Sequence, residues 1–252
     1  MREQFILNAI NLKSYSINEA DKIMVMYSKE KGITRGIAKG AKKPSGRLGA
    51  GRMELLSANK MLLNKGRNLD TICQAEAVNT FFDLRKDINK LFYAMYCAET
   101  AAVFGRENDP DSEKIYNLLY TCLDVISKSK TKEQIMLALL RFQLKIMNIT
   151  GYSIELTQCV KCLETPDEEN TYFSIDAGGI LCRSCAEKII KKIKIHDKIR
   201  GFLYTLLKED FNAHTIYDEK ASEKVCSVCI NLLKNYIEYY SQKKFKTAAL
   251  LD

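Results

Sequence analysis

The spacing of apolar residues changes near residue 80, and this change divides the chain into two regions of different secondary structure. Before it, five short segments alternate in part and are rich in β-branched or large apolar residues: Arg2–Lys13, Ile23–Lys29, Gly32–Lys39, Arg52–Leu63 and Leu69–Val78. Turn-forming sequence separates them. Five short strands in succession predict a small antiparallel barrel, closed or partly closed, although the fourth segment is also compatible with a helix.

After residue 80 the apolar residues follow a helical spacing. From Phe81 onward they recur every three or four residues, which predicts one amphipathic helix that ends near Gly105. The pair Asp109-Pro110 combines a capping residue with a proline suited to a first helical position. This pair therefore predicts the start of a second helix.

The remaining sequence predicts further helices. Thr131 and Gln134 have the spacing of a capping box, which predicts a third helix that ends at Gly151. Later helical patterns lie at Ala186–Ile195, His196–Lys208 and Ala221–Tyr240. The expected domains are a barrel at residues 1–80 and a mainly helical domain at residues 81–252.

Residues 157–187 contain two Cys-x-x-Cys pairs, Cys159 with Cys162 and Cys182 with Cys185. Two intervening residues let one tight turn aim both thiolates of a pair at a single ion, so two pairs can complete a tetrahedral four-sulfur zinc site. The sequence between the pairs predicts two short strands joined by a glycine turn, which would bring the pairs together. Four sulfur ligands leave no position for water, so we expect a structural zinc ion. A redox dithiol pair or a fortuitous spacing is the alternative.

A third pair, Cys226 and Cys229, lies within a helical apolar pattern, and packing in the core is the simpler interpretation. A second metal site would need two further ligands, for which only His196 and His214 are available. The nine cysteines are an odd number, and most of them lie singly or in helical sequence. We therefore expect a reducing, cytoplasmic location rather than a secreted disulfide framework. No apolar run is long enough to cross a membrane.

The positive charge of the chain is concentrated near its N-terminus. The formal net charge is +8, and residues 29–67 contain eleven Lys or Arg against two acidic residues. Lys and Arg that neutralise phosphates release condensed counterions, so this density favours binding to a polyanion. A merely solvated surface is the alternative, but such surfaces usually mix both signs of charge.

The sequence offers little for catalysis. It has two histidines, and it contains no Walker lysine loop, G-x-S-x-G elbow or H-E-x-x-H motif. An enzyme acting on nucleic acid is therefore the least favoured class. The chain has no Trp, so any base stacking would depend on residues such as Tyr15, Tyr27 or Phe5. Each of these is more readily explained as part of the core.

The runs Thr34–Arg47 and Leu69–Glu76 resemble the corresponding stretches of the RecO family, bacterial recombination mediators of DNA repair. The order of parts is similar over nearly the whole chain. The resemblance implies an α+β protein: an N-terminal five-stranded OB-fold barrel, then a mainly helical domain with an inserted four-cysteine zinc knuckle. It also implies a protein that does not hydrolyse nucleotides, binds single- and double-stranded DNA, and anneals complementary strands. The pair Cys226/Cys229 and the ending Ser241–Phe245 depart from the family pattern.

The resemblance further implies partners and site residues. The partners are RecR, the single-strand DNA-binding protein and, indirectly, the RecA recombinase, in the cytoplasm at the nucleoid. The DNA-contact role falls on Arg35, Lys39, Lys42, Lys43 and Arg47, and the same basic region adds Arg52, Lys65 and Arg67. The zinc ligands of the family correspond to Cys159, Cys162, Cys182 and Cys185. The rival interpretation is an RNA-binding or transcription-associated adaptor with the same barrel and zinc ribbon.

Overall fold

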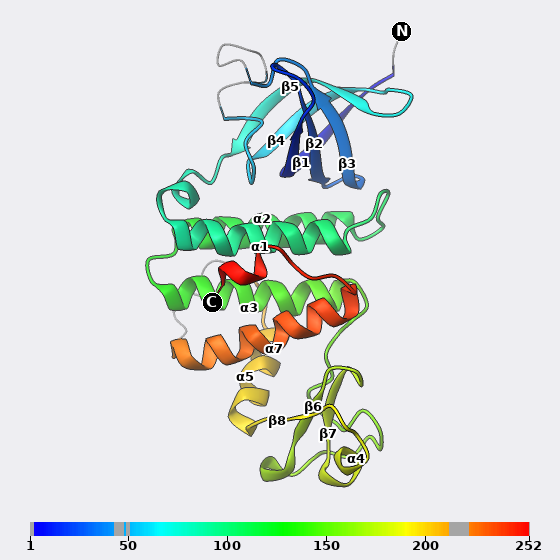
Figure 1. Cartoon of the computed structure of the whole chain (residues 1–252), viewed down its shortest axis with the longest axis vertical. Helices are drawn as coiled ribbons and strands as arrows, with labels where there is room; N and C mark the ends of the chain where they lie inside the picture. Colours follow the sequence, from blue (N-terminus) through cyan, green and yellow to red (C-terminus); the bar gives the residue numbers. More distant parts are fainter. Residues whose placement is uncertain (1–2, 43–47, 49–50, 212–221, 252) are drawn as a thin grey trace. The chain divides into compact units, whose positions relative to one another are not determined.

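A computed structural model describes residues 3–42, 48, 51–211 and 222–251 of the chain. The described residues fall into two compact units. The N-terminal unit is Met1–Lys128 with Ala249–Asp252, and the C-terminal unit is Ser129–Ala248. Figure 1 labels the helices and strands of both units.

The N-terminal unit begins with a closed barrel of five strands. They are β1 (Gln4–Ser16), β2 (Lys22–Ser28), β3 (Gly32–Ala38), β4 (Ala58–Asn64) and β5 (Asp70–Asn79). Their order around the barrel is β1-β2-β3-β5-β4, in which β3 and β5 are parallel and the other neighbours are antiparallel. Since β1 pairs with both β2 and β4, this one strand closes the barrel. The barrel and the helices that follow it confirm the predicted α+β class.

Alternation along the strands produces the barrel interior. Every second side chain points to the same side of a strand, and the inward positions hold large apolar residues with almost no exposed surface: Leu7, Met24, Met26, Met61, Leu63 and Ile72. The outward positions carry the charged and polar side chains. The barrel core is therefore apolar, and the outer faces are available for other contacts.

The fourth strand begins at Ala58, whereas the sequence predicted a start at Arg52. The side-chain amide of Asn11 donates hydrogen bonds to the carbonyls of Arg52 and Glu54, each at 2.8 Å. Leu56 adopts a positive φ of 64°, which lies in the left-handed region and not in the extended region of a strand. These contacts hold residues 52–57 in an irregular path before pairing starts.

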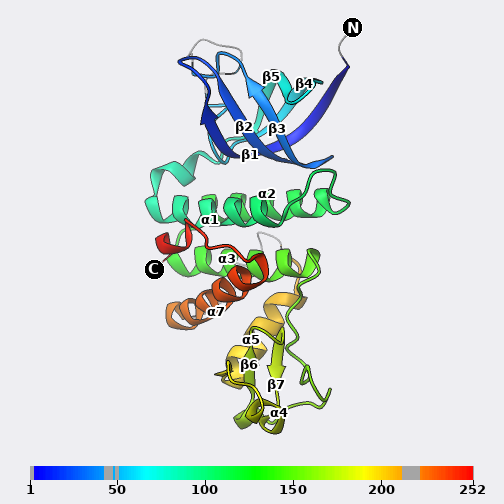
Figure 2. The same ribbon diagram turned by 45° about the vertical axis from the view of Figure 1, so that its right-hand side comes forward.

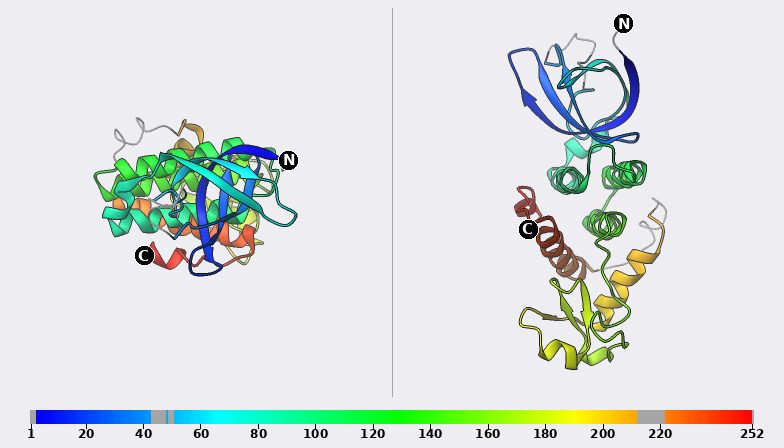
Figure 3. Two further views of the ribbon diagram at one scale, coloured as in Figure 1. Left: turned by 90° about the horizontal axis from the view of Figure 1, so that it is seen from above. Right: turned by 90° about the vertical axis from the view of Figure 1, so that its right-hand side faces the viewer.

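The N-terminal unit continues with η1 (Phe82–Lys86), α1 (Ile88–Phe104) and α2 (Ser112–Lys128). The single helix predicted from Phe81 is wrong at its start, because Asp87 is extended between η1 and α1. The Asp87 carboxylate accepts hydrogen bonds from the backbone N–H groups of Asn89 and Lys90, which caps α1. Helices α1 and α2 lie side by side and are seen end-on in the right panel of Figure 3.

The C-terminal unit combines three long helices with a small sheet. The helices are α3 (Lys132–Ile149), α5 (Asp197–Lys208) and α7 (Glu223–Ser241), and Figure 2 shows α3 beside α7. The sheet has the order β7-β6-β8, with β6 (Tyr172–Ser174), β7 (Gly179–Leu181) and β8 (Ile193–Lys194). The short elements of this unit are η2 (Glu168–Asn170) and α4 (Arg183–Glu187), whereas η3 (Ala248–Leu250) begins at its last residue and continues into the N-terminal unit. Across the described part of both units, every helix falls short of the length or the apolar character that a bilayer crossing demands.

The helix predicted at Ala186–Ile195 is also wrong. Its sequence forms only the end of α4, after which Ile193 pairs with Phe173 across the β6–β8 ladder. The Lys192 ammonium donates hydrogen bonds to the carbonyls of Ala186 and Ile189, at 2.6 and 2.9 Å, and so satisfies the end of the short helix. Pairing with β6 therefore overrides the local helical pattern.

The predicted capping box at the start of α3 is confirmed, and it provides a test of the fold. The Thr131 hydroxyl accepts a hydrogen bond from the Gln134 backbone N–H at 3.3 Å. Replacing Thr131 with Ala should lower the free energy of unfolding by about 1 kcal/mol, because that N–H loses its partner. The measurement is a urea titration followed by far-UV circular dichroism. Thr131→Ser keeps the hydroxyl and is the control; equal stability of the two variants would contradict the prediction.

Candidate metal centre and nucleic-acid interface

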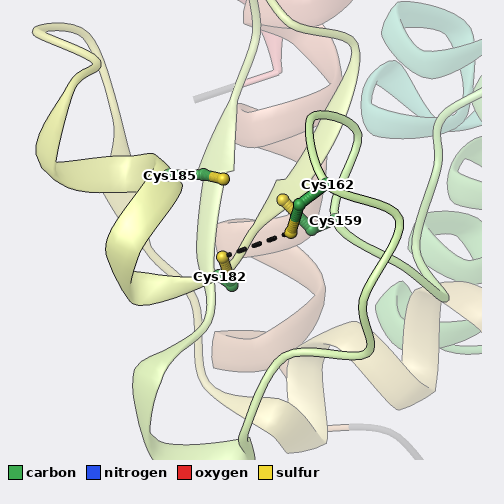
Figure 4. A group of neighbouring side chains, drawn as sticks. All are labelled: Cys159, Cys162, Cys182 and Cys185. Carbon is green, nitrogen blue, oxygen red and sulfur yellow. Dashed lines mark hydrogen bonds between the residues drawn. The ribbon is translucent and has the colours of Figure 1, made fainter.

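The four cysteines of the two Cys-x-x-Cys pairs converge at one point of the C-terminal unit (Figure 4). Their sulfur atoms all lie within 4.8 Å of one another, and the Sγ atoms of Cys162 and Cys182 are 3.7 Å apart. A tetrahedron of sulfurs around zinc, with bonds of about 2.3 Å, has edges of about 3.8 Å. The predicted grouping is confirmed, and its spacing fits a metal ion held by four thiolates.

Each pair lies on a local structure that aims its sulfurs. The first pair lies on a tight turn in which the Cys159 N–H donates to the Glu164 carbonyl and the Leu163 N–H donates to the Cys159 carbonyl, both at 2.8 Å. Leu163 takes a positive φ of 66° to complete this turn. In the second pair, Cys182 is the N-cap of α4 and Cys185 lies in its first turn. A turn and a helix start therefore present the two pairs to each other.

The hairpin of β6 and β7 brings the two pairs together, as the sequence predicted. The Val160 N–H donates to the Ile180 carbonyl at 2.9 Å, which fastens the first turn to β7. The segment before that turn passes so close to β7 that a Cβ atom on Gly179 would lie 2.5 Å from the Glu155 carbonyl oxygen. Gly179 is therefore required by the close approach of two backbones.

The surroundings lower the pKa of two thiols, Cys159 and Cys182, and raise the pKa of the other two, Cys162 and Cys185. Burial alone would raise the pKa of the Cys159 thiol, but hydrogen bonds from the backbone at Cys162 and Cys182 lower it to about 6. The Ser184 hydroxyl lowers the pKa of Cys182, whereas the adjacent Cys182 thiol raises the pKa of Cys185. Four neighbouring thiolates repel one another, so all four sulfurs are deprotonated together only beside a cation. Thiolate is the form of cysteine that binds metal. The donor set thus suits a soft divalent ion.

The other candidate ligands that the structure describes lie outside the cysteine cluster. Cys226 and Cys229 are fully buried on α7, which agrees with packing in the core. The Nδ1 atom of His196 accepts a hydrogen bond from the Lys198 N–H and caps α5. His214 lies outside the described residues.

One outer face of the barrel combines basic, aromatic and apolar side chains. Lys13 on β1, Val25 on β2 and Arg35 on β3 are consecutive partners across the ladders, so they share this face. The face contains a groove of about 370 Å³, lined by Lys13, Tyr15, Ile23, Val25, Ile33, Arg35, Leu69 and Ala102. We call it the barrel groove. Arg35 forms an exposed ion pair with Glu107.

Lys39 and Lys42 follow β3 and are exposed. The Lys42 ammonium donates to the Asn18 carbonyl at 2.6 Å, and the Gly40 N–H donates to the Asp21 carboxylate at 2.8 Å. These bonds hold the segment that follows β3 against the turn between β1 and β2. Lys43 and Arg47, which the resemblance also assigned to DNA, lie outside the described residues.

The other predicted DNA contacts are not all on the same face. Arg52 and Lys60 line a separate groove over β1, β4 and β5, where Lys60 lies opposite Glu76. Lys65 and Arg67 are exposed in the turn between β4 and β5, and Lys65 pairs with Glu3 at 3.0 Å. The structure therefore groups Arg35 with the barrel groove and separates Arg52 from it.

The three aromatic candidates differ in exposure. Tyr15 is 56% exposed and lines the barrel groove, whereas Tyr27 is fully buried. Phe5 is half-buried beneath the Lys31 ammonium, which lies 3.8 Å from its ring centroid. Of the three, Tyr15 alone offers an open ring face, contrary to the simpler expectation that it belongs to the core.

Sequence reasoning missed a second basic region. Residues 183–200 contain seven Lys or Arg against two acidic residues. This local excess disappears when charge is summed over the whole helical region, because the acidic residues there nearly balance it. A count in short windows would have found the cluster.

Comparison with known proteins agrees with these features. Residues 1–81 match the family described as "Recombination protein O N terminal", and residues 85–249 match "Recombination protein O C terminal". A DNA repair protein RecO from Desulforamulus reducens is 33% identical over 246 residues, which cover 98% of this chain and 93% of the relative. Another from Pelotomaculum thermopropionicum is 29% identical over 248 residues, which cover 97% and 92%. The chain belongs to the RecO family of DNA repair proteins.

Proposed function

We propose that this protein is a non-enzymatic mediator of DNA repair and recombination. It binds single- and double-stranded DNA without reading sequence and anneals complementary strands. Together with RecR it helps to load RecA onto DNA coated by the single-strand DNA-binding protein. Membership of the RecO family supports this role and a location in the cytoplasm at the nucleoid.

The barrel groove is the observation that carries the proposal. Five-stranded barrels of the OB type bind oligonucleotides over β2 and β3 and on the loops between β1 and β2 and between β4 and β5. In this chain that face holds Lys13 and Arg35 beside the exposed ring of Tyr15, and Lys42 borders the first of those loops. Cations for phosphates and a ring for bases therefore occur together. Residues 1–80 act as the DNA-binding domain in this proposal.

The charges favour contact with the backbone rather than with particular bases. Lys and Arg at the surface neutralise phosphates of any sequence, and they also screen the repulsion between two strands. Both side chains of the ion pair between Arg35 and Glu107 are exposed, so the pair contributes little to stability. A phosphate can therefore replace the Glu107 carboxylate. Two complementary strands can then approach each other on one protein.

We propose that the four cysteines hold one structural zinc ion. Zinc would be bound by Cys159, Cys162, Cys182 and Cys185, whose sulfur spacing supports a tetrahedral site. The bound ion would offset part of the negative charge of the thiolates and would join the Cys159 turn to α4. The chain itself supplies the turn, the hairpin and the helix start that position the sulfurs.

The barrel groove generates a prediction about salt. Replacing Arg35, Lys39 and Lys42 with Ala should weaken binding to an oligothymidylate of about 16 nucleotides, the upper site size of one such barrel. The dependence of log affinity on log salt should also become shallower by about 2, because each lost phosphate contact removes about 0.7 from the slope for single strands. Fluorescence anisotropy at several salt concentrations measures both quantities.

The control for this experiment is Lys60→Ala on the other outer face, which should leave the slope unchanged. An unchanged slope in the triple variant would show that DNA binds elsewhere. Competition between single-stranded DNA and RNA of equal length separates this proposal from the RNA-binding adaptor, which would prefer RNA.

Tyr15 generates a second prediction. Tyr15→Ala should weaken single-strand binding about tenfold, because stacking of one base on an aromatic ring contributes about 1–3 kcal/mol. Tyr15→Phe keeps the ring and should bind as the unchanged protein does. Anisotropy titrations at one salt concentration measure the difference. Equal loss in the two variants would contradict stacking and point to the hydroxyl.

The zinc proposal is tested by metal content. Purified protein should contain about one zinc ion per chain, and Cys182→Ser should remove most of it, because a hydroxyl replaces one of the four thiolates. Cys73→Ser is the matched control, since Cys73 lies on β5 and outside the cluster. Atomic emission spectroscopy measures the zinc. Full zinc content in Cys182→Ser would contradict the assignment.

A further inference from the structure

The C-terminal unit carries a concentration of positive charge that the barrel groove does not use. Within residues 183–200, Arg183 pairs with Glu187 and Arg200 pairs with Asp197. Five lysines of the same segment have no acidic partner among the described residues: Lys188, Lys191, Lys192, Lys194 and Lys198. Uncompensated charge at this density attracts a polyanion.

Part of this charge borders a groove of about 540 Å³ between the small sheet and the end of α7. Its apolar lining is Phe173, Ile175, Ile193 and Tyr239, and its polar lining is Asp176, Asn235, Glu238, Gln242 and the lysines 191, 192, 243 and 244. The lysines come from two separate segments, one before β8 and one after α7. We call this the α7 groove.

The hydrogen bonds of the α7 groove show which charges are free to bind. The Glu238 carboxylate accepts from the Lys244 ammonium at 2.6 Å and from the Phe245 N–H at 3.2 Å, so it is neutralised in place. Lys192 is engaged with carbonyls at the end of α4. Lys191 and Lys243 are exposed and have no such bond among the described residues, so one free ammonium remains from each segment.

We propose that the α7 groove is a second binding site for single-stranded nucleic acid, distinct from the barrel groove. Phosphates would contact Lys191 and Lys243, and a base would stack on Tyr239, which is 48% exposed. This inference rests on the proposed function and deepens it, because annealing requires two strands on one protein. The barrel groove would hold one strand and the α7 groove the other.

The distribution of charge favours a nucleic acid over an acidic peptide. The lysines are not confined to the groove: Lys188, Lys194 and Lys198 extend the positive surface along the chain beyond it. A strand with a charge on every nucleotide can use such a surface along its length, whereas a short acidic segment uses only part of it. Exposed Tyr239 and Ile193 also suit flat base faces, which stack without regard to sequence.

The test uses the full-length protein and two non-complementary oligothymidylates, one with a donor dye and one with an acceptor. Energy transfer reports both strands on one protein. The variant Lys191→Glu with Lys243→Glu should weaken binding of the second strand at least about tenfold and leave the first strand bound. Its matched control, Lys130→Glu with Lys224→Glu, reverses two exposed lysines of the same unit that do not line the groove.

The outcomes separate this inference from the proposed function. Loss of energy transfer in the groove variant alone supports the second site, and unchanged energy transfer overturns it. A second control measures binding of poly-glutamate. If poly-glutamate binds the unchanged protein but not the groove variant, and oligothymidylate does not displace it, the ligand of the α7 groove is an acidic polypeptide and the inference is overturned. Failure of the unchanged protein to bind any strand would instead refute the proposed function.

Tyr239 provides an independent measurement. Tyr239→Leu keeps an apolar side chain but removes the ring, so second-strand binding should fall about tenfold. Tyr239→Phe keeps the ring and should restore it. Equal binding by the Leu and Phe variants would overturn the stacking contact, and circular dichroism of both variants checks that α7 is intact.

Discussion

The closure of the barrel by β1 is the constraint on which the N-terminal unit depends. With 13 residues, β1 is long enough to pair with β2 on one side and β4 on the other, so the sheet closes without an open edge. A register shift between Asn11 and Lys13 lets the strand bend, and the buried Asn11 amide fastens the segment before β4. Closure then gives every strand an apolar inner face, and it leaves an outer surface that helices α1 and α2 contact at β1, β2 and β3. The two grooves of the barrel lie on different parts of that outer surface.

The C-terminal unit is limited by the small size of its sheet. Its sheet has strands of three, three and two residues, which is too little to be stable alone. The sequence compensates with four converging sulfurs and with packing around Cys159, Leu181 and Ala186. A bound ion at this point would replace the core that so few residues cannot supply. The edge strand β8 and the α7 groove both depend on this small region.

Much of the architecture follows from local sequence, and the exceptions have physical causes. Alternation, the Thr131 capping box and the cysteine spacing predicted the barrel, α3 and the four-cysteine cluster, because each is a short-range pattern. The start of β4 and the end of α4 were missed, since tertiary contacts by Asn11 and by β6 decide them. Exposure could not be predicted either: only the fold shows that Tyr15 is open while Tyr27 is buried. The boundary at residue 80 and the DNA-contact residues stay predictions.

Under the proposed function, the ion pair between Arg35 and Glu107 has a consequence for how long a strand stays bound. A carboxylate fixed beside the arginine competes with every incoming phosphate, and it returns as soon as that phosphate leaves. The arginine therefore contributes less to the lifetime of the complex than an unpaired one would. For the annealing proposed above, such weak retention is useful, because the finished duplex must be released before the surface can accept new strands.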